Sequence, residues 1–162
     1  MTKQYPLEIF MPPNILKAKA GDAEPDADIA AILRAESALE SLKSEFHSWT
    51  TTDVQRLTEC RDRFAARPDQ AARQALFRVA HDLKGQAATF EYPMISRMAS
   101  SLTRLLEGMN EVDAVPLGLI DAHVTAIGAL HRDDIRTASD RMSIVVAEEL
   151  EARVTDALAE TG

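Results

Sequence analysis

The sequence has few of the residues that cross-link or interrupt a chain: one cysteine, six glycines and seven prolines among 162 residues. Because Cys60 is alone, it cannot form an internal disulfide and suits a reducing compartment, so we expect a cytoplasmic protein. No run approaches the roughly 18 uninterrupted apolar residues of a membrane span, and the N-terminus lacks the apolar core of a signal peptide. The sequence therefore predicts no association with a membrane.

Basic residues are also scarce, since 18 Lys and Arg stand against 26 Asp and Glu and give a net charge of −8. A field of this sign repels phosphate backbones, so nucleic-acid binding is not expected. The overall charge still permits a local basic patch, and Arg78 with Lys84 could form one beside His81.

Alternating, strand-like segments are essentially absent, whereas apolar residues at helical spacing recur along most of the chain. We predict an all-α fold: an antiparallel four-helix bundle with an additional N-terminal helix or a kinked long helix. Two regions are expected. Residues 1–25, which contain several prolines, form an extended N-terminal arm, and residues 26–162 form the bundle domain.

Helix boundaries follow from caps, prolines and glycines. The first apolar pattern begins near Asp26 or Asp28 and resumes at 54–64, with residues 48–53 either kinking one helix or separating two. Further helices are predicted at about 69–90, from Pro93 to about 109, and from Pro116 to 135. A last helix, capped by Ser139, should carry Met142 and Val145 on its apolar face.

The helix at 69–90 has two distinct faces. At about 100° per residue, one stripe is apolar and predicts a buried face; it contains Leu76, Val79, Ala80, Leu83, Ala87 and Phe90. His81, Gly85 and Ala88 fall roughly opposite it, and we expect them to face outward. Glycine inside a helix costs about 1 kcal/mol relative to alanine, so Gly85 calls for a local reason, such as room for another protein above the imidazole.

The segment Ala80-His81-Asp82-Leu83-Lys84-Gly85-Gln86 resembles the phosphoacceptor motif of histidine-containing phosphotransfer (HPt) domains. The resemblance is strongest over residues 70–109. Together with the proline-containing arm, this motif resembles that of a stand-alone alphaproteobacterial type of HPt protein. Two positions depart from the family pattern: Glu91 stands where glycine is usual, and Thr103 stands where some members have glutamine.

The resemblance implies a phosphorelay function. His81 would accept a phosphoryl group through Nε2 from a receiver-domain phosphoaspartate and pass it to another receiver, with Lys84 stabilising the phosphoryl oxygens. The implied partners are response-regulator receiver domains and a hybrid sensor histidine kinase. Residues that would contact the partner are Gly85, Ala88, Phe77 and Arg78. No cofactor or metal is expected on this chain, because the divalent metal that such a transfer uses would lie on the receiver. We expect the chain to be a monomer.

A second interpretation is a non-phosphorylated helical-bundle adaptor that binds a signalling partner through the same surface. The two differ at His81, because a carrier needs its imidazole and an adaptor does not. An autonomous kinase is disfavoured, since the sequence has no glycine-rich nucleotide loop and offers no convincing set of catalytic side chains. Any enzymatic role would be that of a phosphoryl carrier without its own ATP site.

Overall fold

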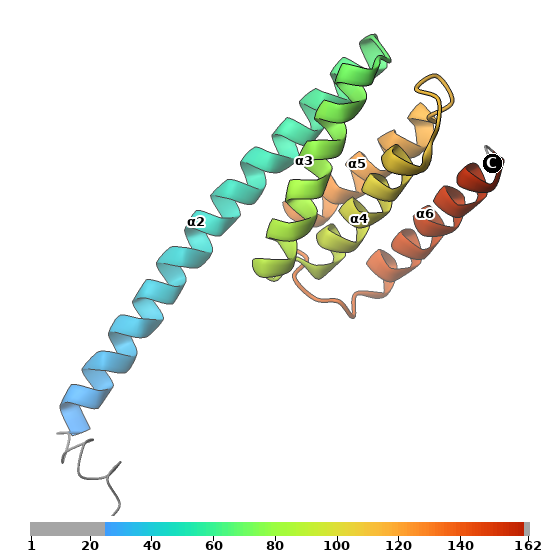
Figure 1. The fold of residues 1–162 in the computed structure, drawn as a ribbon. Helices are drawn as coiled ribbons and strands as arrows, with labels where there is room; N and C mark the ends of the chain where they lie inside the picture. Colours follow the sequence, from blue (N-terminus) through green and yellow to red (C-terminus); the bar gives the residue numbers. More distant parts are fainter. Residues whose placement is uncertain (1–24, 161–162) are drawn as a thin grey trace, which may run out of the picture. The chain divides into compact units, whose positions relative to one another are not determined.

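The computed structural model describes residues 25–160, which fold into five α-helices with no strand among them (Figure 1). The helices are α2 (Pro25–Ala66), α3 (Gln70–Thr89), α4 (Pro93–Gly108), α5 (Leu117–Arg132) and α6 (Arg141–Glu160). The predicted all-α helical bundle is confirmed. The predicted N-terminal arm lies outside the described residues, apart from Pro25.

The described residues divide into two units, residues 25–41 and residues 42–160. In the first unit, the described residues belong to α2, and they expose four large apolar side chains, Ile29, Ile32, Leu33 and Leu39. All the tertiary contacts described below lie within the second unit.

Residues 48–53 do not interrupt α2, so neither a turn nor a second helix separates the two apolar patterns. Three threonines in this stretch are poor helix formers, but their hydroxyls form hydrogen bonds within the helix. Thr50, Thr51 and Thr52 each donate to the carbonyl four residues earlier, at distances of 2.8–3.1 Å. The hydroxyls share carbonyls that already accept helical hydrogen bonds, and the helix continues through them.

In the second unit, α4 packs against α3, α5 and α6, which run side by side with it (Figure 1). Its buried apolar side chains run from Met94 to Leu106, and the buried Met109 directly follows the helix. At the far end of α4 the approach to α6 is close, since a Cβ added to Gly108 would stand 2.7 Å from Leu158 Cδ2. Leu57, Cys60 and Phe64 extend the same core from α2.

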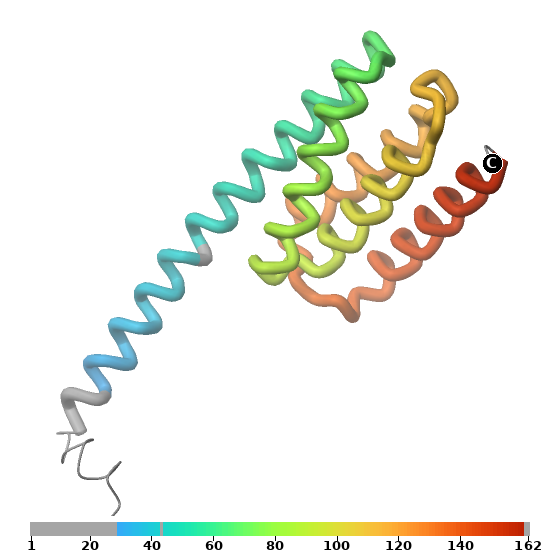
Figure 2. The backbone as a smooth tube through the Cα atoms, viewed as in Figure 1, coloured from blue at the N-terminus to red at the C-terminus, as the bar shows by residue number. Residues whose placement is uncertain are grey.

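Two helix ends use a left-handed residue that is not glycine. After α3, Glu91 has φ 64°, and Tyr92 N–H donates to the Ala87 carbonyl at 2.8 Å. After α5, Asp134 has φ 49°, and Ile135 N–H donates to the Leu130 carbonyl at 3.0 Å. Both are the six-to-one bond of a Schellman motif. Glu91 thus adopts the backbone that glycine would supply, and the chain reverses sharply between α3 and α4 (Figure 2).

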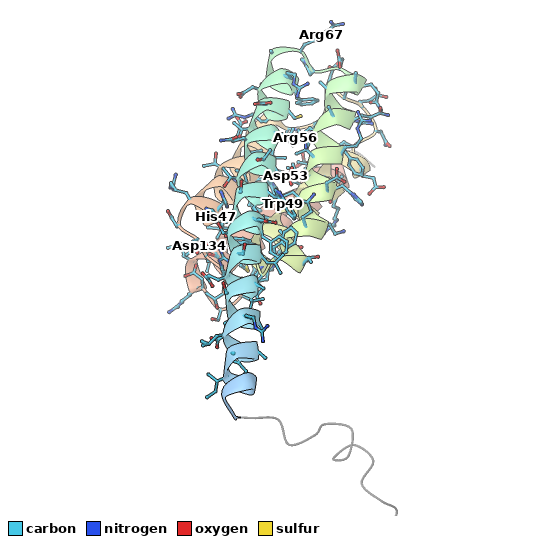
Figure 3. The ribbon with its side chains drawn as sticks, turned by 90° about the vertical axis from the view of Figure 1, so that its left-hand side faces the viewer. His47, Trp49, Asp53, Arg56, Arg67 and Asp134 are labelled. Atoms are coloured by element: carbon cyan, nitrogen blue, oxygen red, sulfur yellow. The ribbon has the colours of Figure 1, made fainter. Side chains whose placement is uncertain are left out.

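The side chain of Tyr92 joins these helix ends to α2. Its hydroxyl donates to Asp134 Oδ1 at 2.6 Å and lies 3.1 Å from His47 Nδ1. Because the Tyr92 proton is used for Asp134, His47 Nδ1–H must be the donor to the tyrosine oxygen. Figure 3 shows His47 on α2 beside Asp134. Burial and the Asp134 hydrogen bond raise the pKa of Tyr92 to about 12.

The predictions for the last helix need correction. α5 ends at Arg132, earlier than expected, because Asp134 takes the left-handed conformation. The cap of α6 is Asp140 rather than Ser139: its Oδ2 accepts from Ser143 N at 2.8 Å and also from the Ser143 hydroxyl. Met142 and Val145 are exposed, by 71 % and 54 %, since the buried face of α6 is formed by Ser143, Ala147, Leu150 and Val154.

Replacing Glu91 by glycine should stabilise the second unit by roughly 0.5–1 kcal/mol, because the left-handed backbone costs energy for any residue with a Cβ. Urea unfolding of the two proteins measures the difference. Glu91→Ala is the matched control, and it should give no gain because alanine also carries a Cβ. A glycine variant less stable than the parent would contradict this explanation of the helix end.

Lowering the pH from about 7.5 to about 5.5 should reduce the free energy of unfolding, because two buried histidines stay neutral in the fold. Burial lowers the pKa of His123, and burial followed by the charge of His47 lowers the pKa of His131. The unfolded chain protonates both rings near pH 6.5, so their contribution is complete above that pH and is lost as the pH falls below it.

Urea unfolding at both pH values tests this effect. A His123→Gln/His131→Gln double variant should lose less stability on acidification than the parent. Hydrogen bonds from Tyr92 and Arg97 lower the pKa of Asp134 and the pKa of Glu151 below the ordinary carboxyl range, so both groups stay ionised across this window. Equal free energies of unfolding at the two pH values would contradict the argument.

Candidate functional site

The phase of α3 places His81 on its solvent side. Leu76, Ala80, Leu83 and Ala87 are buried, and Val79 and Phe90 pack partly buried against the same core. Asp69 starts the helix, since its Oδ1 accepts from Ala72 N–H at 2.8 Å. The predicted buried face is confirmed. His81 lies away from it, with 63 % of its side chain exposed.

Around His81 the surface forms a hollow of about 310 Å³, which we call the His81 hollow. It brings together four of the predicted site residues: Phe77, Arg78, His81 and Lys84. The Phe77 and His81 rings stack with their centroids 5.9 Å apart and their planes 27° apart. Three further side chains line the hollow, and they are Asp82, Thr103 and Glu107.

The carboxylate of Asp82 lies close to the imidazole, with Oδ1 3.7 Å from His81 Nδ1. This distance permits electrostatic attraction and is too long for a hydrogen bond. A carboxylate on the Nδ1 side favours the tautomer with the proton on Nδ1, which leaves the lone pair on Nε2. Asp82 is not among the site residues predicted from the sequence, although its position next to His81 was a signal for it.

Gly85 and Ala88, the two other predicted contact residues, do not line the His81 hollow. Both are exposed on α3, and a Cβ built on Gly85 would have no neighbouring atom within 4 Å. Within the part of the chain that the structure describes, no other helix crosses α3 at Gly85. The open space leaves the surface beside His81 free of obstruction.

Thr103 occupies the position on α4 where a second-helix group could approach the imidazole. Its side chain is buried, and its hydroxyl donates to the Ser100 carbonyl at 2.8 Å. The hydroxyl is therefore engaged within α4. Glu107, one turn later, brings a carboxylate to the rim of the same hollow.

The three other histidines have different environments. His123 is fully buried, with Nδ1 2.8 Å from the Leu119 carbonyl and Nε2 3.0 Å from Ser101 Oγ. His131 is buried and lies 2.9 Å from Thr51 Oγ1, while His47 is bound to Tyr92. Each of these rings has at least one nitrogen held by another side chain or a carbonyl, whereas no hydrogen bond to a His81 ring nitrogen is found within residues 25–160.

Among residues 25–160, no group of three or more histidine, cysteine or acidic side chains is arranged to hold a metal ion. Within the same residues, none of the helices combines the length and the apolar character that crossing a membrane requires.

A family model for the Hpt domain matches residues 22–131, which is more than half of the chain. The chain belongs to the Hpt domain family. No significant match was found among curated proteins or among solved structures. The matched range ends within α5, so α6 and its contacts with α4 lie outside the part that the family model describes.

Hpt domains act in histidine phosphotransfer within phosphorelays, and this establishes the general class of chemistry for the chain. The family match includes the whole of α3 and α4, and hence every side chain of the His81 hollow.

Proposed function

We propose that this Hpt domain protein is a phosphoryl carrier, which accepts a phosphoryl group on His81 from a receiver-domain phosphoaspartate and passes it to another receiver. The observation that carries the proposal is the exposure of the His81 imidazole on a helix whose opposite face is buried. Lys84 and Arg78 on the rim of the His81 hollow supply positive charge for the phosphoryl oxygens.

In the proposed transfer, the Nε2 lone pair of neutral His81 attacks the phosphorus atom of the acyl phosphate. The N–P bond forms, the bond from phosphorus to the aspartate oxygen breaks, and the electron pair leaves with the aspartate carboxylate. The ring keeps its Nδ1 proton and becomes more positive. Asp82, 3.7 Å from Nδ1, would then stabilise the phosphorylated ring. Return of the group to a second receiver aspartate reverses these steps.

The partners in this proposal are receiver domains, with a hybrid sensor histidine kinase as the ultimate source of the group. Gly85 and Ala88 offer an unobstructed helix surface on which a receiver could approach the imidazole. Phe77, half-buried beside the ring, offers an apolar contact. No cofactor of this chain enters the transfer, and the divalent ion is proposed to belong to the receiver.

His81→Gln should abolish phosphoryl transfer while leaving the helical circular dichroism and the unfolding free energy unchanged, because the side chain is exposed. The assay uses a panel of phosphorylated receiver domains and follows radiolabel on the Hpt chain. His47→Gln is the control histidine variant and should still accept label. Label on the His81→Gln protein would contradict the proposal, and retained function without any label on the parent chain would favour an adaptor.

Lys84→Ala should slow the transfer by roughly 10-fold to 100-fold, the scale on which one charge-stabilising group acts in a transition state. Its stability should not change, since Lys84 is exposed. Rates come from rapid-quench measurements with the receiver that transfers fastest to the parent. Arg153→Ala on α6 is the control for loss of a cation. Equal rates for Lys84→Ala and the parent would remove the role assigned to Lys84.

A further inference from the structure

A second and larger surface depression adjoins the His81 hollow. It has a volume of about 480 Å³, and we call it the α4 cleft, defined by Lys84, Ser96, Arg97, Ser100, Arg104 and Glu151. Lys84 lines both depressions, so the two are continuous at that side chain. The matched family segment does not include α6, which supplies Glu151.

The charges in the α4 cleft have the opposite sign to the chain as a whole. Three cationic side chains face one carboxylate there, although the chain carries a net charge of −8. Arg97 is held by Glu151 in a bidentate pair, with both N–O distances 2.7 Å, so its charge is largely compensated. The hydrogen bond to Arg97 also lowers the pKa of Glu151 and keeps it ionised.

Arg104 and Lys84 remain as the cations available to a partner. Arg104 is exposed, and its Nη2 donates only a long bond of 3.3 Å to the neutral Thr155 hydroxyl. In the described part of the chain, no carboxylate lies within 4.0 Å of either cation. The rest of the cleft lining is rich in serine hydroxyls, which suits a charged or polar occupant rather than an apolar one.

The position of the α4 cleft allows a protein bound at His81 to cover it. A stable interface buries about 800 Å² on each partner, a footprint far wider than one side chain. Since the two depressions share Lys84, a receiver centred on His81 would extend over both. A partner with acidic side chains at the edge of its contact surface would gain from Arg104 on approach.

We propose that the α4 cleft binds an acidic segment of the receiver domain that docks on His81, with Arg104 as its main contact. This inference rests on the phosphocarrier function proposed above. The proposed contact zone on α4 is charged and determines which receivers are favoured. It is separate from the groups that take part in the transfer itself. The bidentate Arg97–Glu151 pair keeps the wall of the cleft in place.

The test compares Arg104→Glu with Arg153→Glu, a matched charge reversal on an exposed arginine of α6. With the fastest receiver of the panel, Arg104→Glu should lower the second-order rate constant of transfer by about 10-fold at low ionic strength. The loss should shrink when the salt concentration rises from about 0.05 M to about 0.5 M. Arg153→Glu should transfer within about twofold of the parent at both salt concentrations.

Phosphorylation of His81 by phosphoramidate, a small donor that needs no docking surface, separates docking from chemistry. Its rate should be the same in Arg104→Glu and the parent. An unchanged transfer rate from the receiver, or an equal slowing with phosphoramidate, would overturn the proposed contact. If inorganic phosphate binds in the α4 cleft and Arg104→Glu has no effect on transfer, the proposed contact is overturned in favour of a small-anion site. If the parent accepts no label from either donor, the phosphocarrier function itself fails.

Discussion

The burial of one stripe of α3 against α4 is the constraint on which the site depends. Leu76, Ala80, Leu83 and Ala87 have no exposed surface, and a helix that fixes four such positions has no freedom to rotate. The remaining residues of α3 then have fixed directions. His81 faces solvent because Ala80 and Leu83 do not, so the exposure of the proposed phosphoacceptor follows directly from the packing of the core.

The turn after α3 supports this arrangement from the other end. Glu91 takes a left-handed conformation, and Tyr92 turns into the core with its hydroxyl between His47 and Asp134. These contacts connect α2, the start of α4 and the end of α5. Arg136 completes the cluster, with its guanidinium carbon 4.7 Å from the centre of the Tyr92 ring and its Nε 2.8 Å from Asp134. Strain at two helix ends is thus combined with a network of polar contacts between three helices.

Much of the fold could be predicted because helical periodicity and caps are local signals. The apolar face of α3, the start of that helix near residue 69 and the helix start at Pro93 all agree with the structure. The last helix was harder, because Met142 and Val145 satisfy the spacing but point away from the surface that α4 and α5 offer. Its cap was assigned one residue too early, since Ser139 and Asp140 are both good capping residues and only the structure distinguishes them. The continuity of α2 could not be decided from sequence, because threonines lower helix propensity while their hydroxyls can bond within the helix.

For the candidate site, the sequence motif identified the residues on α3, whereas the contribution of α4 depended on tertiary structure. Thr103 and Glu107 on the rim of the His81 hollow, and Arg104 in the α4 cleft, come close to α3 only through helix packing. The family match places the chain among Hpt domains, and the geometry adds which surfaces around His81 are open and which are charged.

We propose that the fold leaves one imidazole nitrogen, Nε2 of His81, available for phosphorylation. Incubation of the protein with phosphoramidate, followed by peptide mapping and ³¹P and ¹⁵N NMR of the modified ring, is the decisive measurement. We expect a single acid-labile phosphoryl group on Nε2 of His81 and none on His47, His123 or His131. A phosphoryl group on Nδ1, on another histidine, or on no histidine at all would contradict it.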